Sequence, residues 1–398
     1  LPPVVLLGGE ANALSVAREL AARGTKVFAV GAEPTCVRHS RRCEWIDLPP
    51  GGDAEARFAD FLLGPRSERF AGAVLLACSD AALQVLARHR EALLRRYRLD
   101  LAHPPAQLAM LDKLETYQLA RAAGVATPLF WAVESRADVR AIARELVFPL
   151  MVKPRLSHVF ERHFGRKHVI VNDAAELSAA IDAASAAGVG VLLMEVIPGA
   201  DDQLSSYYTY VDEEGAPLCH YTKRVVRRFP VGMGAASLHI TGDVPEIVQP
   251  SLRLLRQAGV RGLANVEFKF DARDGRHKLI ECNSRFTASN ALVAASGLRL
   301  ASFIYDRAAG RPAELVYDRR DAGRTMRLWD PIRDFAAYRQ LRRAGRLTLW
   351  RWVRTVMHRQ RFPYFAWSDP GPTISRLLKG GARAIGRSSN GLHGGADR

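Results

Sequence analysis

The chain of 398 residues is 48% hydrophobic, which is enough to build the cores of two or three domains. This composition excludes an intrinsically disordered protein, and no apolar run approaches the ~20 residues that a membrane-spanning helix needs. The formal net charge of +16 is concentrated in residues 311–398, which hold 19 of the 57 basic side chains but only 7 of the 41 acidic ones. The basic character therefore belongs to the tail, and the rest of the chain is nearly neutral.

The first hundred residues alternate between short apolar runs and helical patterns. Residues 4–7, 26–30 and 73–77 are expected strands, and a helical pattern occupies residues 80–97. Strands that are separated by helices predict a parallel sheet. The G-x-G-x-x-G spacing of dinucleotide-binding proteins is absent after Gly8, which disfavours a Rossmann dehydrogenase.

Two lysines stand at element boundaries in the next segment. Lys113 follows Asp112 at the start of a helical pattern that ends at Gly124. Lys153 ends the apolar strand pattern of residues 148–153. A lysine at the end of a buried strand is costly unless an anion lies beside it, so we expect Lys153 to face an anionic partner.

Further strand patterns follow, and charged residues stand at their ends. A strand pattern over residues 191–197 ends at a Pro-Gly pair, and Asp201 and Asp202 come directly after it. Beyond another alternating strand and a turn, a strand is expected to end in Lys223 and Arg224. The basic run then continues through Arg227 and Arg228. For these two arginines we give equal weight to a solvated surface and to a functional role.

The strongest pattern in the chain is a hairpin. Residues 265–271 alternate between apolar and polar side chains, and the Asp-Gly pair at 274–275 predicts the turn. Because side chains alternate between the faces of a strand, Glu281 and Asn283 project to the same side, and a register that brings Glu267 beside them makes a cluster of oxygen ligands. Two carboxylates and an amide oxygen suit Mg²⁺. The alternative is a hairpin with solvated charges on its outer face.

Glu267 followed by Glu281-x-Asn283-x-Arg285 resembles the metal-binding end of the ATP-grasp superfamily, whose members use Mg²⁺-ATP to activate a carboxylate as an acyl phosphate. Motifs that look like those of the family also occur upstream in the family's order, and they are Asp112-Lys113, Lys153 and Glu195. Several motifs in one order are more specific than any single one.

The resemblance covers about residues 105–310 and, more weakly, residues 1–104. It implies an α/β fold in which a parallel-sheet domain over 1–104 precedes a two-lobed α+β ATP-grasp domain over 105–310. A basic, mostly helical extension over 311–398 is expected to complete the chain, with a disordered end after Arg387.

The resemblance also implies three groups of site residues. The expected metal ligands, for Mg²⁺ or alternatively Mn²⁺, are Glu267, Glu281 and Asn283. The expected ATP-binding residues are Lys113, Lys153, Glu195, Val196, Ile197, Asp201 and Asp202. The expected catalytic residues are Lys223, Arg224 and Arg285. The first two cations would stabilise the transferred phosphoryl group, and Arg285 would orient the carboxylate or that group.

The loop at residues 155–167 corresponds in this resemblance to a flap over the phosphates. Such flaps are typically rich in glycine, whereas this one contains only Gly165, so side chains are expected to replace backbone amides as phosphate donors. His158 and His163 suggest a metal site as the alternative. We favour the phosphate-facing or solvated flap, because neither a cysteine nor a third ligand accompanies the two histidines.

These observations predict an ATP-dependent ligase that joins the carboxylate of an amino acid to an amine through an acyl phosphate. Activation followed by aminolysis needs no Ser, Cys or His nucleophile, and the sequence offers no convincing triad. The stretch around Asp201 and the Arg-x-Trp-Asp-Pro motif at 327–331 look similar to predicted carboligases related to D-aspartate ligase. The expected partners are small-molecule carboxylate and amine substrates, and no oligomeric state is predicted.

Two other functions remain open. The first is an ATP-grasp carboxylase that activates bicarbonate. The second is a non-catalytic nucleotide-binding protein that docks to an anionic membrane through its basic tail. The complete set of oxygen ligands at Glu267, Glu281 and Asn283 argues against the second, since a site without catalysis has no need for all of them.

Residues 346–362 are expected to form a basic amphipathic helix. Its apolar side would carry Leu349, Trp350, Val353, Val356 and Met357, and its basic side Arg351, Arg354, His358 and Arg361. This helix either packs on the catalytic body, which we favour, or lies on an anionic membrane surface. Nucleic acid is disfavoured because no recognition motif accompanies the charge.

The number and spacing of the cysteines indicate the cellular compartment. There are five, an odd number, and they are scattered without CxxC spacing. This usage favours a reduced environment over a disulfide framework. We therefore expect a cytoplasmic protein, with peripheral contact at the inner face of the membrane if the basic tail binds lipid.

Overall fold

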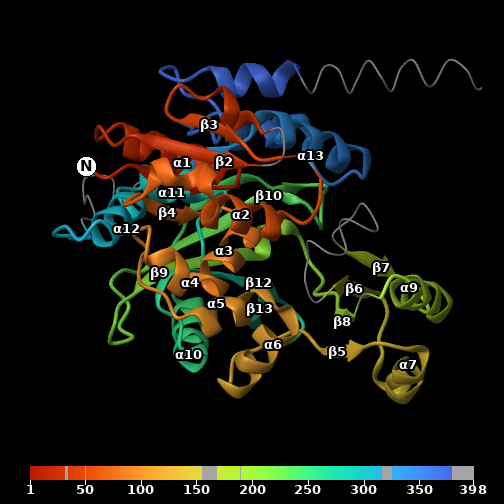
Figure 1. The fold of residues 1–398 in the computed structure, drawn as a ribbon. Helices are drawn as coiled ribbons and strands as arrows, with labels where there is room; N and C mark the ends of the chain where they lie inside the picture. The colour runs from red at the N-terminus through yellow and green to blue at the C-terminus, as the bar shows by residue number, and fades with distance from the viewer. Residues whose placement is uncertain (32–34, 50, 155–167, 189, 316–324, 379–398) are drawn as a thin grey trace, which may run out of the picture. The chain divides into compact units, whose positions relative to one another are not determined.

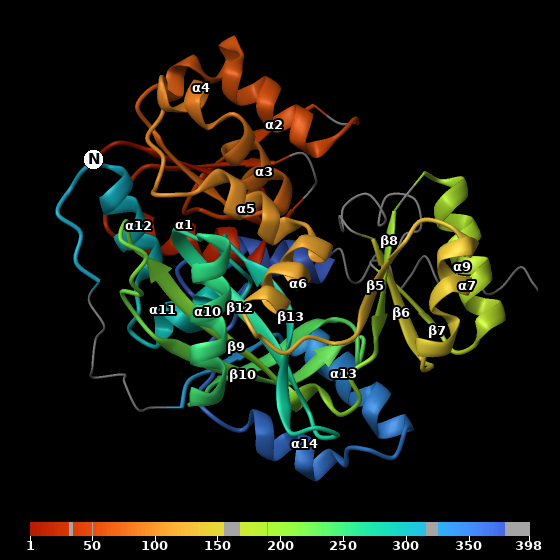
Figure 2. The ribbon, with the colours of Figure 1, turned by 90° about the horizontal axis from the view of Figure 1, so that it is seen from below.

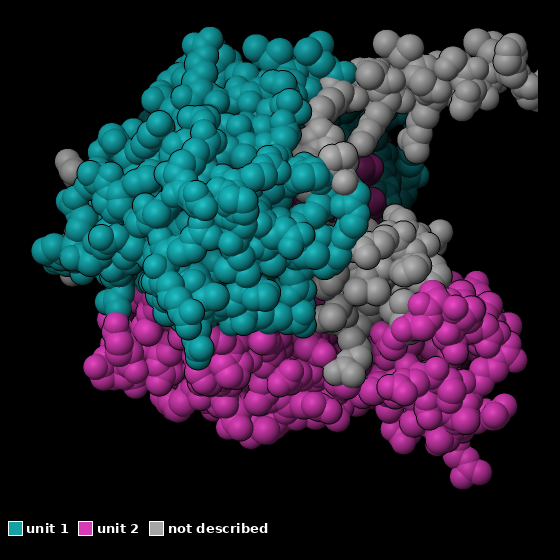
Figure 3. Space-filling view, in the orientation of Figure 1, with its two compact units in different colours: residues 1–100, 285–398 teal, residues 101–284 magenta. Residues whose placement is uncertain are grey.

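The computed structural model describes the chain at residues 1–31, 35–49, 51–154, 168–188, 190–315 and 325–378. Its helices and strands are drawn in Figure 1. They form two compact units: unit 1 contains residues 1–100 and 285–398, and unit 2 contains residues 101–284 (Figure 3). The predicted flap at residues 155–167 and the predicted disordered end after Arg387 lie outside the described residues.

Unit 1 contains a parallel four-stranded sheet, which confirms the fold predicted for the N-terminal part. Its elements are β1 (Val4–Leu7), α1 (Ala11–Ala21), β2 (Val27–Gly31), β3 (Glu44–Asp47), α2 (Ala54–Leu63), β4 (Val74–Ala77), α3 (Asp80–Arg88) and α4 (Arg90–Leu94). The strands lie in the order β3-β2-β1-β4, and Val4 is opposite both Val27 and Val74. Every residue of β1 is buried, as expected for a strand that is covered on both faces.

The helix predicted over residues 80–97 is two helices in the structure. Helix α3 ends before His89, where ψ is 19°, and α4 follows it. The turn at this point allows Leu93 to be fully buried and the Tyr97 hydroxyl to donate a hydrogen bond to the Leu62 carbonyl at 2.9 Å. The prediction of one continuous helix was therefore wrong, because burial of the second segment requires a change of direction.

The C-terminal part of unit 1 packs with its N-terminal part. Its elements are α11 (Asn290–Ala295), α12 (Leu300–Ala308), β14 (Arg327–Trp329), α13 (Pro331–Arg343) and α14 (Leu349–Val356). Helices α11 and α12 contact α1, and the Asn290 side chain donates a hydrogen bond to Ser15 Oγ at 2.8 Å. Residues 285–310, which the sequence assigned to the ATP-grasp domain, thus belong to unit 1, and the three domain boundaries stay a prediction.

The predicted tail helix is shorter than residues 346–362, and a different tryptophan packs. Helix α14 begins after Thr348, whose hydroxyl accepts a hydrogen bond from Arg351 N at 3.3 Å. Trp352 stacks on Tyr338 at 4.8 Å, and its Nε1 donates a hydrogen bond to the buried Asp334 carboxylate at 2.8 Å. The exposed apolar side chains of this region are Leu349 (52%), Trp350 (68%) and Met357 (72%). Only part of the predicted apolar side is therefore packed. The hydrogen bond to Asp334 and the stacking on Tyr338 place Trp352, rather than Trp350, against the rest of unit 1.

Unit 2 contains a small antiparallel sheet with two helices. Its elements are β5 (Phe130–Val133), α7 (Arg136–Ile142), β6 (Leu150–Pro154), β7 (Val169–Val171), α9 (Ala174–Ala186) and β8 (Val191–Glu195). The strand order is β5-β8-β6-β7, and α7 and α9 lie beside the sheet in Figure 2. Leu150, Val152, Leu193 and Ile181 form the centre of its core. The strand that carries Lys153 thus alternates between core residues and the opposite face.

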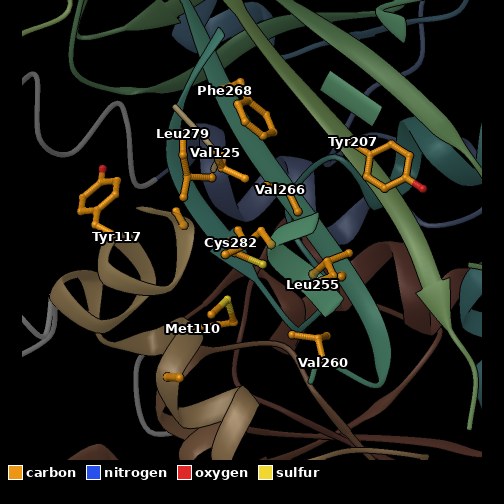
Figure 4. Packing of buried hydrophobic residues seen from close by; sticks show 14 of the residues in the cluster. Met110, Tyr117, Val125, Tyr207, Leu255, Val260, Val266, Phe268, Leu279 and Cys282 are labelled. Atoms are coloured by element: carbon orange, nitrogen blue, oxygen red, sulfur yellow. The ribbon is translucent and has the colours of Figure 1, made fainter. Parts of the chain in front are cut away.

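A larger antiparallel sheet forms the rest of unit 2. Its strands are β9 (Leu204–Val211), β10 (Tyr221–Phe229), β11 (Ala235–Thr241), β12 (Gly262–Asp271) and β13 (Arg276–Asn283), in the order β13-β12-β9-β10-β11. The helices α5 (Pro104–Leu111), α6 (Lys113–Ala122) and α10 (Val248–Ala258) share one apolar core with it. Figure 4 shows Val266, Phe268 and Tyr207 of the strands in this core with Met110 and Leu255 of the helices. The opposite face of the sheet carries polar side chains.

The predicted hairpin is formed by β12 and β13. Asn265 is opposite Asn283 and Glu267 is opposite Glu281, which is the register that the ligand cluster requires. The turn contains Gly275 at φ +68°, a conformation that glycine adopts without steric cost. The sequence prediction of this hairpin and of its register is therefore confirmed.

A β-bulge at Ile280 interrupts the alternation of β13. Glu267 is opposite Glu281, but Phe268 is opposite Leu279, so Ile280 is an extra residue on its strand. Leu279 can therefore enter the apolar core while Glu281 turns to the polar face. Strict alternation would have placed Leu279 and Glu281 on the same face.

Two further observations concern membranes and disulfides. Among the residues that the structure describes, no helix is long and apolar enough to cross a bilayer. All five cysteines are free.

Candidate functional site

The three predicted metal ligands lie together on the polar face of the large sheet. Glu267 and Glu281 are directly opposite each other on β12 and β13. Asn283 lies two residues beyond Glu281, and its Nδ2 donates a hydrogen bond to Glu281 Oε1 at 3.0 Å. Strand pairing thus brings two carboxylates and one amide together. Their oxygen atoms could serve as metal ligands.

Asn265 lies beside these ligands and was not predicted as a site residue. It is opposite Asn283 and two residues before Glu267, and it is fully buried. In the described part of the chain, neither its Nδ2 nor its Oδ1 has a hydrogen-bond partner. An unsatisfied buried amide costs about 1–3 kcal/mol, so it points to a ligand or a metal-bound water beside it.

The donor set fits a hard cation. Among the described residues, no group of three or more His, Cys, Asp or Glu side chains is placed to hold a metal ion. The predicted set at the hairpin consists of two carboxylates and an amide. Oxygen ligands without imidazole or thiolate suit Mg²⁺ or Mn²⁺. Glu267, Glu281 and Asn283 would hold such an ion.

Lys223 faces the same carboxylates across the sheet. Ser206 on β9 is opposite both Glu267 and Lys223, so the polar row Glu281, Glu267, Ser206, Lys223 and Thr241 crosses four strand pairings. Lys223 is 1% exposed. Burial lowers the pKa of its ammonium group, while Glu267 and then Glu281 act in the opposite direction. The predicted catalytic lysine and the predicted metal ligands therefore share one electrostatic environment.

His239 is a neighbour of Lys223 that the sequence did not reveal. It lies on β11, and its Nδ1 is 3.3 Å from Lys223 Nζ. His239 is itself largely buried. Only the alternating polar residues of residues 235–241 gave a signal for it, and that signal is shared by many strands.

Arg224 lies apart from this row. The sequence placed Lys223 and Arg224 at the end of a strand, but β10 begins at Tyr221 and continues to Phe229. Successive residues of a strand point to opposite faces, so Arg224 is exposed on the other face from the buried Lys223. The structure thus brings Lys223 to the carboxylates and not Arg224.

The two predicted phosphate-binding lysines belong to the same environment. Lys113 is the first residue of α6, and Asp112 caps this helix by accepting a hydrogen bond from Leu114 N at 2.9 Å. The pKa of Lys153 is lowered to about 8, first by burial and then by the charge of Lys113, while the charge of Glu281 acts in the opposite direction. Two lysines and a carboxylate predicted to bind metal therefore lie close enough to influence one another, as a phosphate site beside a cation site would require.

Tyr117 supports the bulge that positions Glu281. It lies one turn after Lys113 on α6, and its hydroxyl donates a hydrogen bond to the carbonyl of Ile280 at 2.8 Å. Burial raises its pKa, and the charge of Glu281 raises it further. The sequence did not identify this residue, because a tyrosine on an apolar helix face is usually a core residue.

The carboxylate of Glu195, at the end of β8, is held by its neighbours. Its Oε1 is 2.5 Å from Arg273 NH2, and its Oε2 accepts a hydrogen bond from Leu129 N at 3.1 Å. Arg273 also pairs with Asp271, whose pKa it holds well below the usual range. The predicted recognition of adenine therefore depends on the main chain of Glu195, Val196 and Ile197.

Lys269 holds the segment that follows Glu195. Its Nζ donates hydrogen bonds to the carbonyl oxygens of Ile197 and Gly199 at 2.7 and 3.1 Å. Burial is the main reason why the pKa of the Lys269 ammonium group is lowered. Lys269 lies two residues after Glu267, so one strand carries both a predicted metal ligand and a support for the segment that is predicted to recognise adenine.

Asp201 and Asp202 differ in their surroundings. Asp201 is buried, and its Oδ1 accepts hydrogen bonds from Arg228 Nε at 2.6 Å and Gly232 N at 3.2 Å. Asp202 is exposed. The ion pair of Arg228 with Asp201 and the burial of Arg227 show that these two arginines do not form a solvated face.

Arg285 belongs to unit 1, two residues beyond the end of β13. Its Nε pairs with Asp80 Oδ1 at 2.5 Å, and its NH1 donates a hydrogen bond to the Phe286 carbonyl at 3.3 Å. Asp80 is the first residue of α3. Its predicted role with the carboxylate or phosphoryl group stays a prediction.

Comparisons with known proteins bear on this arrangement. The model of the carbamoyl-phosphate synthase L chain ATP-binding domain matches residues 235–315, which include the predicted metal ligands. The chain is 25% identical over 345 residues to D-aspartate ligase of Enterococcus faecium (strain Aus0004), covering 82% of this chain and 81% of that protein. It is 31% identical over 194 residues to D-alanine–D-alanine ligase of Stutzerimonas stutzeri (strain A1501), covering 45% of this chain and 56%, about half, of that relative.

A solved structure shares the fold. Biotin carboxylase of Campylobacter jejuni, in its β,γ-ATP complex, superposes with a TM-score of 0.62 at 15% identity, covering 78% of this chain and 72% of that one. A likeness at this identity concerns the fold alone. It agrees with the α/β class predicted from the sequence.

Proposed function

Since the chain belongs to the ATP-grasp superfamily, we propose that it joins a small-molecule carboxylate to an amine in an ATP-dependent reaction through an acyl phosphate. The observation that carries this proposal is that Lys113 and Glu281 both act electrostatically on Lys153, and Glu267 and Glu281 on Lys223, while Glu267 and Glu281 are opposite each other on the hairpin. Cations for phosphates and carboxylates for a hard metal ion are the parts that phosphoryl transfer needs.

The roles follow from the contacts. Lys113 and Lys153 would hold the ATP phosphates, and the proximity of Glu267, Glu281 and Asn283 supports their proposed role as the residues that would hold Mg²⁺. Mg²⁺, when bound, neutralises charge on the phosphate oxygens. Lys223 faces the transferred phosphoryl group and stabilises the charge that develops on it. The main chain after Glu195 binds adenine, and the exposed Asp202 is the better placed of the two acids for the ribose.

The reaction has two displacements. An oxygen of the substrate carboxylate attacks the γ-phosphorus, the bond from that phosphorus to the β-phosphate oxygen breaks, and ADP leaves. The amine nitrogen then attacks the acyl carbon, phosphate leaves, and the amine loses a proton. Cys282 lies next to Glu281, but burial in the core raises the pKa of its thiol, so it stays protonated and is no nucleophile.

The carboxylate that we propose is that of an amino acid. This proposal is supported by the match to D-aspartate ligase, which covers four-fifths of the chain, and by the partial match to D-alanine–D-alanine ligase. The amine is a second small molecule or a peptide. Bicarbonate activation is the alternative, and it is supported by fold likeness alone.

Hydroxylamine trapping tests the ligase chemistry. Incubation with Mg²⁺-ATP, hydroxylamine and a panel of amino acids in both configurations should give ADP and a hydroxamate that depends on one carboxylate. Bicarbonate as the sole stimulator of ADP release would instead support the carboxylase. ATP binding without turnover under any condition would support a non-catalytic nucleotide-binding protein.

The Glu281→Gln variant tests the metal assignment. It keeps the volume of the side chain but removes its charge, so turnover should fall about 100-fold or more while the folded state is retained. Glu44→Gln, on β3 of unit 1, is the matched control and should be fully active. Unchanged turnover of Glu281→Gln would contradict the metal assignment.

We also propose that the exposed side of α14 contacts anionic membranes. Leu349, Trp350 and Met357 are exposed there, and the exposed Arg351 and Arg354 lie on the same helix. The requirement for ATP favours the cytoplasmic face. Sedimentation with phosphatidylglycerol vesicles should retain the wild-type protein, whereas Trp350→Ser should weaken binding, and neutral phosphatidylcholine vesicles should bind neither. Equal binding of both proteins to anionic vesicles would contradict this contact.

A further inference from the structure

A cavity of about 520 Å³ is lined entirely by residues of unit 1. It is bounded by α1, α11 and residues 360–367 of the C-terminal segment. Small side chains line part of it, namely Ala22 directly after α1 and Ala291 and Ala295 on α11. A volume of this size is in the range of sites for small molecules, which is roughly 300–1,000 Å³. None of the residues to which the proposed reaction assigns a metal, phosphate or adenine lines it.

Two of the residues that line this cavity each contain a buried acceptor oxygen. Glu19 is 8% exposed, and its Oε1 accepts a hydrogen bond from Ser302 N at 2.8 Å, whereas its Oε2 has no partner within the described residues. Gln360 donates from Nε2 to the Val356 carbonyl at 2.9 Å, and its Oε1 is likewise buried without a partner there. Buried oxygen atoms are almost always hydrogen-bonded, so both indicate a ligand that donates hydrogen bonds.

The wall of the cavity contains aromatic rings. Phe365 and Trp367 meet edge to face with their centroids 4.9 Å apart, and both line the cavity. Trp367 is 90% exposed, which is unusual for a tryptophan outside a binding surface. Aromatic faces beside a carboxylate attract a cation such as an ammonium group.

Cationic side chains line the same cavity. Arg299 and Arg361 are both exposed and contribute to its lining. Arg18 lines it as well, but it is paired with Asp369 at 2.9 Å. Arg299 also acts electrostatically on Glu19 and so lies near it. A ligand with an ammonium group alone would meet repulsion here, whereas a ligand that also carries a carboxylate would be attracted by both signs of charge.

We propose that this cavity binds a zwitterionic amino acid with an apolar side chain. Its ammonium group donates to Glu19 and Gln360, its carboxylate pairs with Arg299 and Arg361, and its side chain contacts Trp367. This site lies apart from the residues of the proposed reaction and needs neither ATP nor metal. Amino acids are also the proposed carboxylate substrates, so the cavity is a place where their concentration can be sensed.

Calorimetric titration with leucine tests this proposal, carried out on the full-length Glu281→Gln protein without nucleotide. Failure of the ligase reaction would not affect the result in this background. Leucine should bind, and isopentylamine and 4-methylpentanoate, which each lack one of its charged groups, should bind at least about tenfold more weakly. Equal binding of leucine and of either fragment would overturn the proposal of a zwitterion site.

Two further variants locate the binding. Glu19→Gln keeps an oxygen for Ser302 N but loses its charge, and Trp367→Ala changes an exposed side chain, so the protein should fold in both cases. Each should weaken leucine binding about tenfold or more. Trp350→Ala, which removes an exposed tryptophan from α14, is the matched control and should bind as the parent does. Leucine binding that neither variant weakens, or no leucine binding at all, would overturn the proposal.

Discussion

Burial sets the charge state of the lysines at the polar face. Lys153 is partly buried with a second lysine nearby, and Lys223 is almost completely buried between β9 and β11. Both have lowered pKa values, because a charged ammonium group loses solvation in the interior. Carboxylates partly compensate for this loss, and they are the predicted metal ligands. The residues of the site are thus coupled by charge even where no hydrogen bond joins them.

The pKa of Lys153 predicts how nucleotide binding depends on pH. The pKa in the free protein is about 8, and an anionic phosphate raises it by favouring the charged form. Binding therefore takes up a proton above pH 8. We expect ADP affinity to be constant below about pH 8 and to weaken as the pH rises further. Titration of ADP from neutral to alkaline pH measures this slope.

Two substitutions separate charge from pKa at this position. Lys153→Arg keeps a guanidinium that stays charged, so the slope should disappear while binding persists. Lys153→Met removes the charge, so ADP should bind more weakly at every pH below 8. A wild-type affinity that does not change between pH 7 and alkaline pH would exclude Lys153 from the phosphate site.

The hairpin of β12 and β13 connects three functions at the level of secondary-structure elements. It carries the proposed metal ligands, its bulge is held by α6 through Tyr117, and Lys269 on β12 binds the carbonyl groups that follow β8. Its far end carries Arg273, which pairs with Glu195. One pair of strands thus positions the proposed metal ligands relative to the segment that is proposed to bind adenine.

Removal of the Tyr117 hydroxyl should shift Mg²⁺ dependence. Tyr117→Phe loses the hydrogen bond to Ile280, so the bulge and with it Glu281 are held less firmly. Stability should fall by about 1 kcal/mol, and the Mg²⁺ concentration for half-maximal turnover should rise several-fold. Tyr305→Phe, which loses a hydrogen bond to the Pro2 carbonyl in unit 1, should lose similar stability without the Mg²⁺ effect. The same Mg²⁺ dependence in both variants would refute the role of Tyr117.

Removal of the Lys269 ammonium should affect nucleotide binding more than chemistry. Lys269→Met keeps the length of the side chain but loses both hydrogen bonds to the Ile197 and Gly199 carbonyls. We expect the KM for ATP to rise roughly 5- to 30-fold with a small change in kcat. Lys26→Met, at an exposed position of unit 1, serves as control. A roughly 5- to 30-fold fall of kcat with an unchanged KM for ATP would instead show that Lys269 does not act through the adenine segment.

At the scale of the whole molecule, the basic tail is part of a folded unit. Asp369 is fully buried and accepts hydrogen bonds from Arg18 Nε, Ser40 Oγ and Arg41 N at 2.8–2.9 Å. Arg376 pairs with Asp330 at 2.7 Å. Residues of the C-terminal segment are therefore tied to α1 and its surroundings, and removal of this segment would leave Arg18 without its partner.

Neutralisation of Asp369 should destabilise unit 1. Asp369→Asn breaks a buried pair and leaves Arg18 with an uncompensated charge, which should cost about 2–4 kcal/mol. The exposed pair of Glu44 and Arg69 is the control, and Glu44→Gln should cost less than about 0.5 kcal/mol. Urea denaturation followed by circular dichroism measures both. Equal midpoints for the two variants would show that the tail contributes little to the stability of unit 1.

The sequence by itself determined the features that depend on local order. The alternation over residues 265–271 and the Asp-Gly turn specified the hairpin and the buried face of β12, since a shift by one residue would expose Val266 and Phe268. The apolar strand before Lys153 and the alternation of strands and helices near the N-terminus were equally readable. These patterns can be recognised because side chains on one face recur every 2 residues in a strand and every 3.6 residues in a helix, so that nearby residues alone reveal them.

Tertiary structure alone decided the features that depend on distant residues. The bulge at Ile280, the approach of His239 to Lys223 and the choice of Trp352 over Trp350 as the packed tryptophan each require a partner from another element. A sequence pattern states which face of a strand or helix is apolar. It does not state which buried charge or carbonyl group is nearby, because the energy of those contacts depends on geometry that only the folded chain provides.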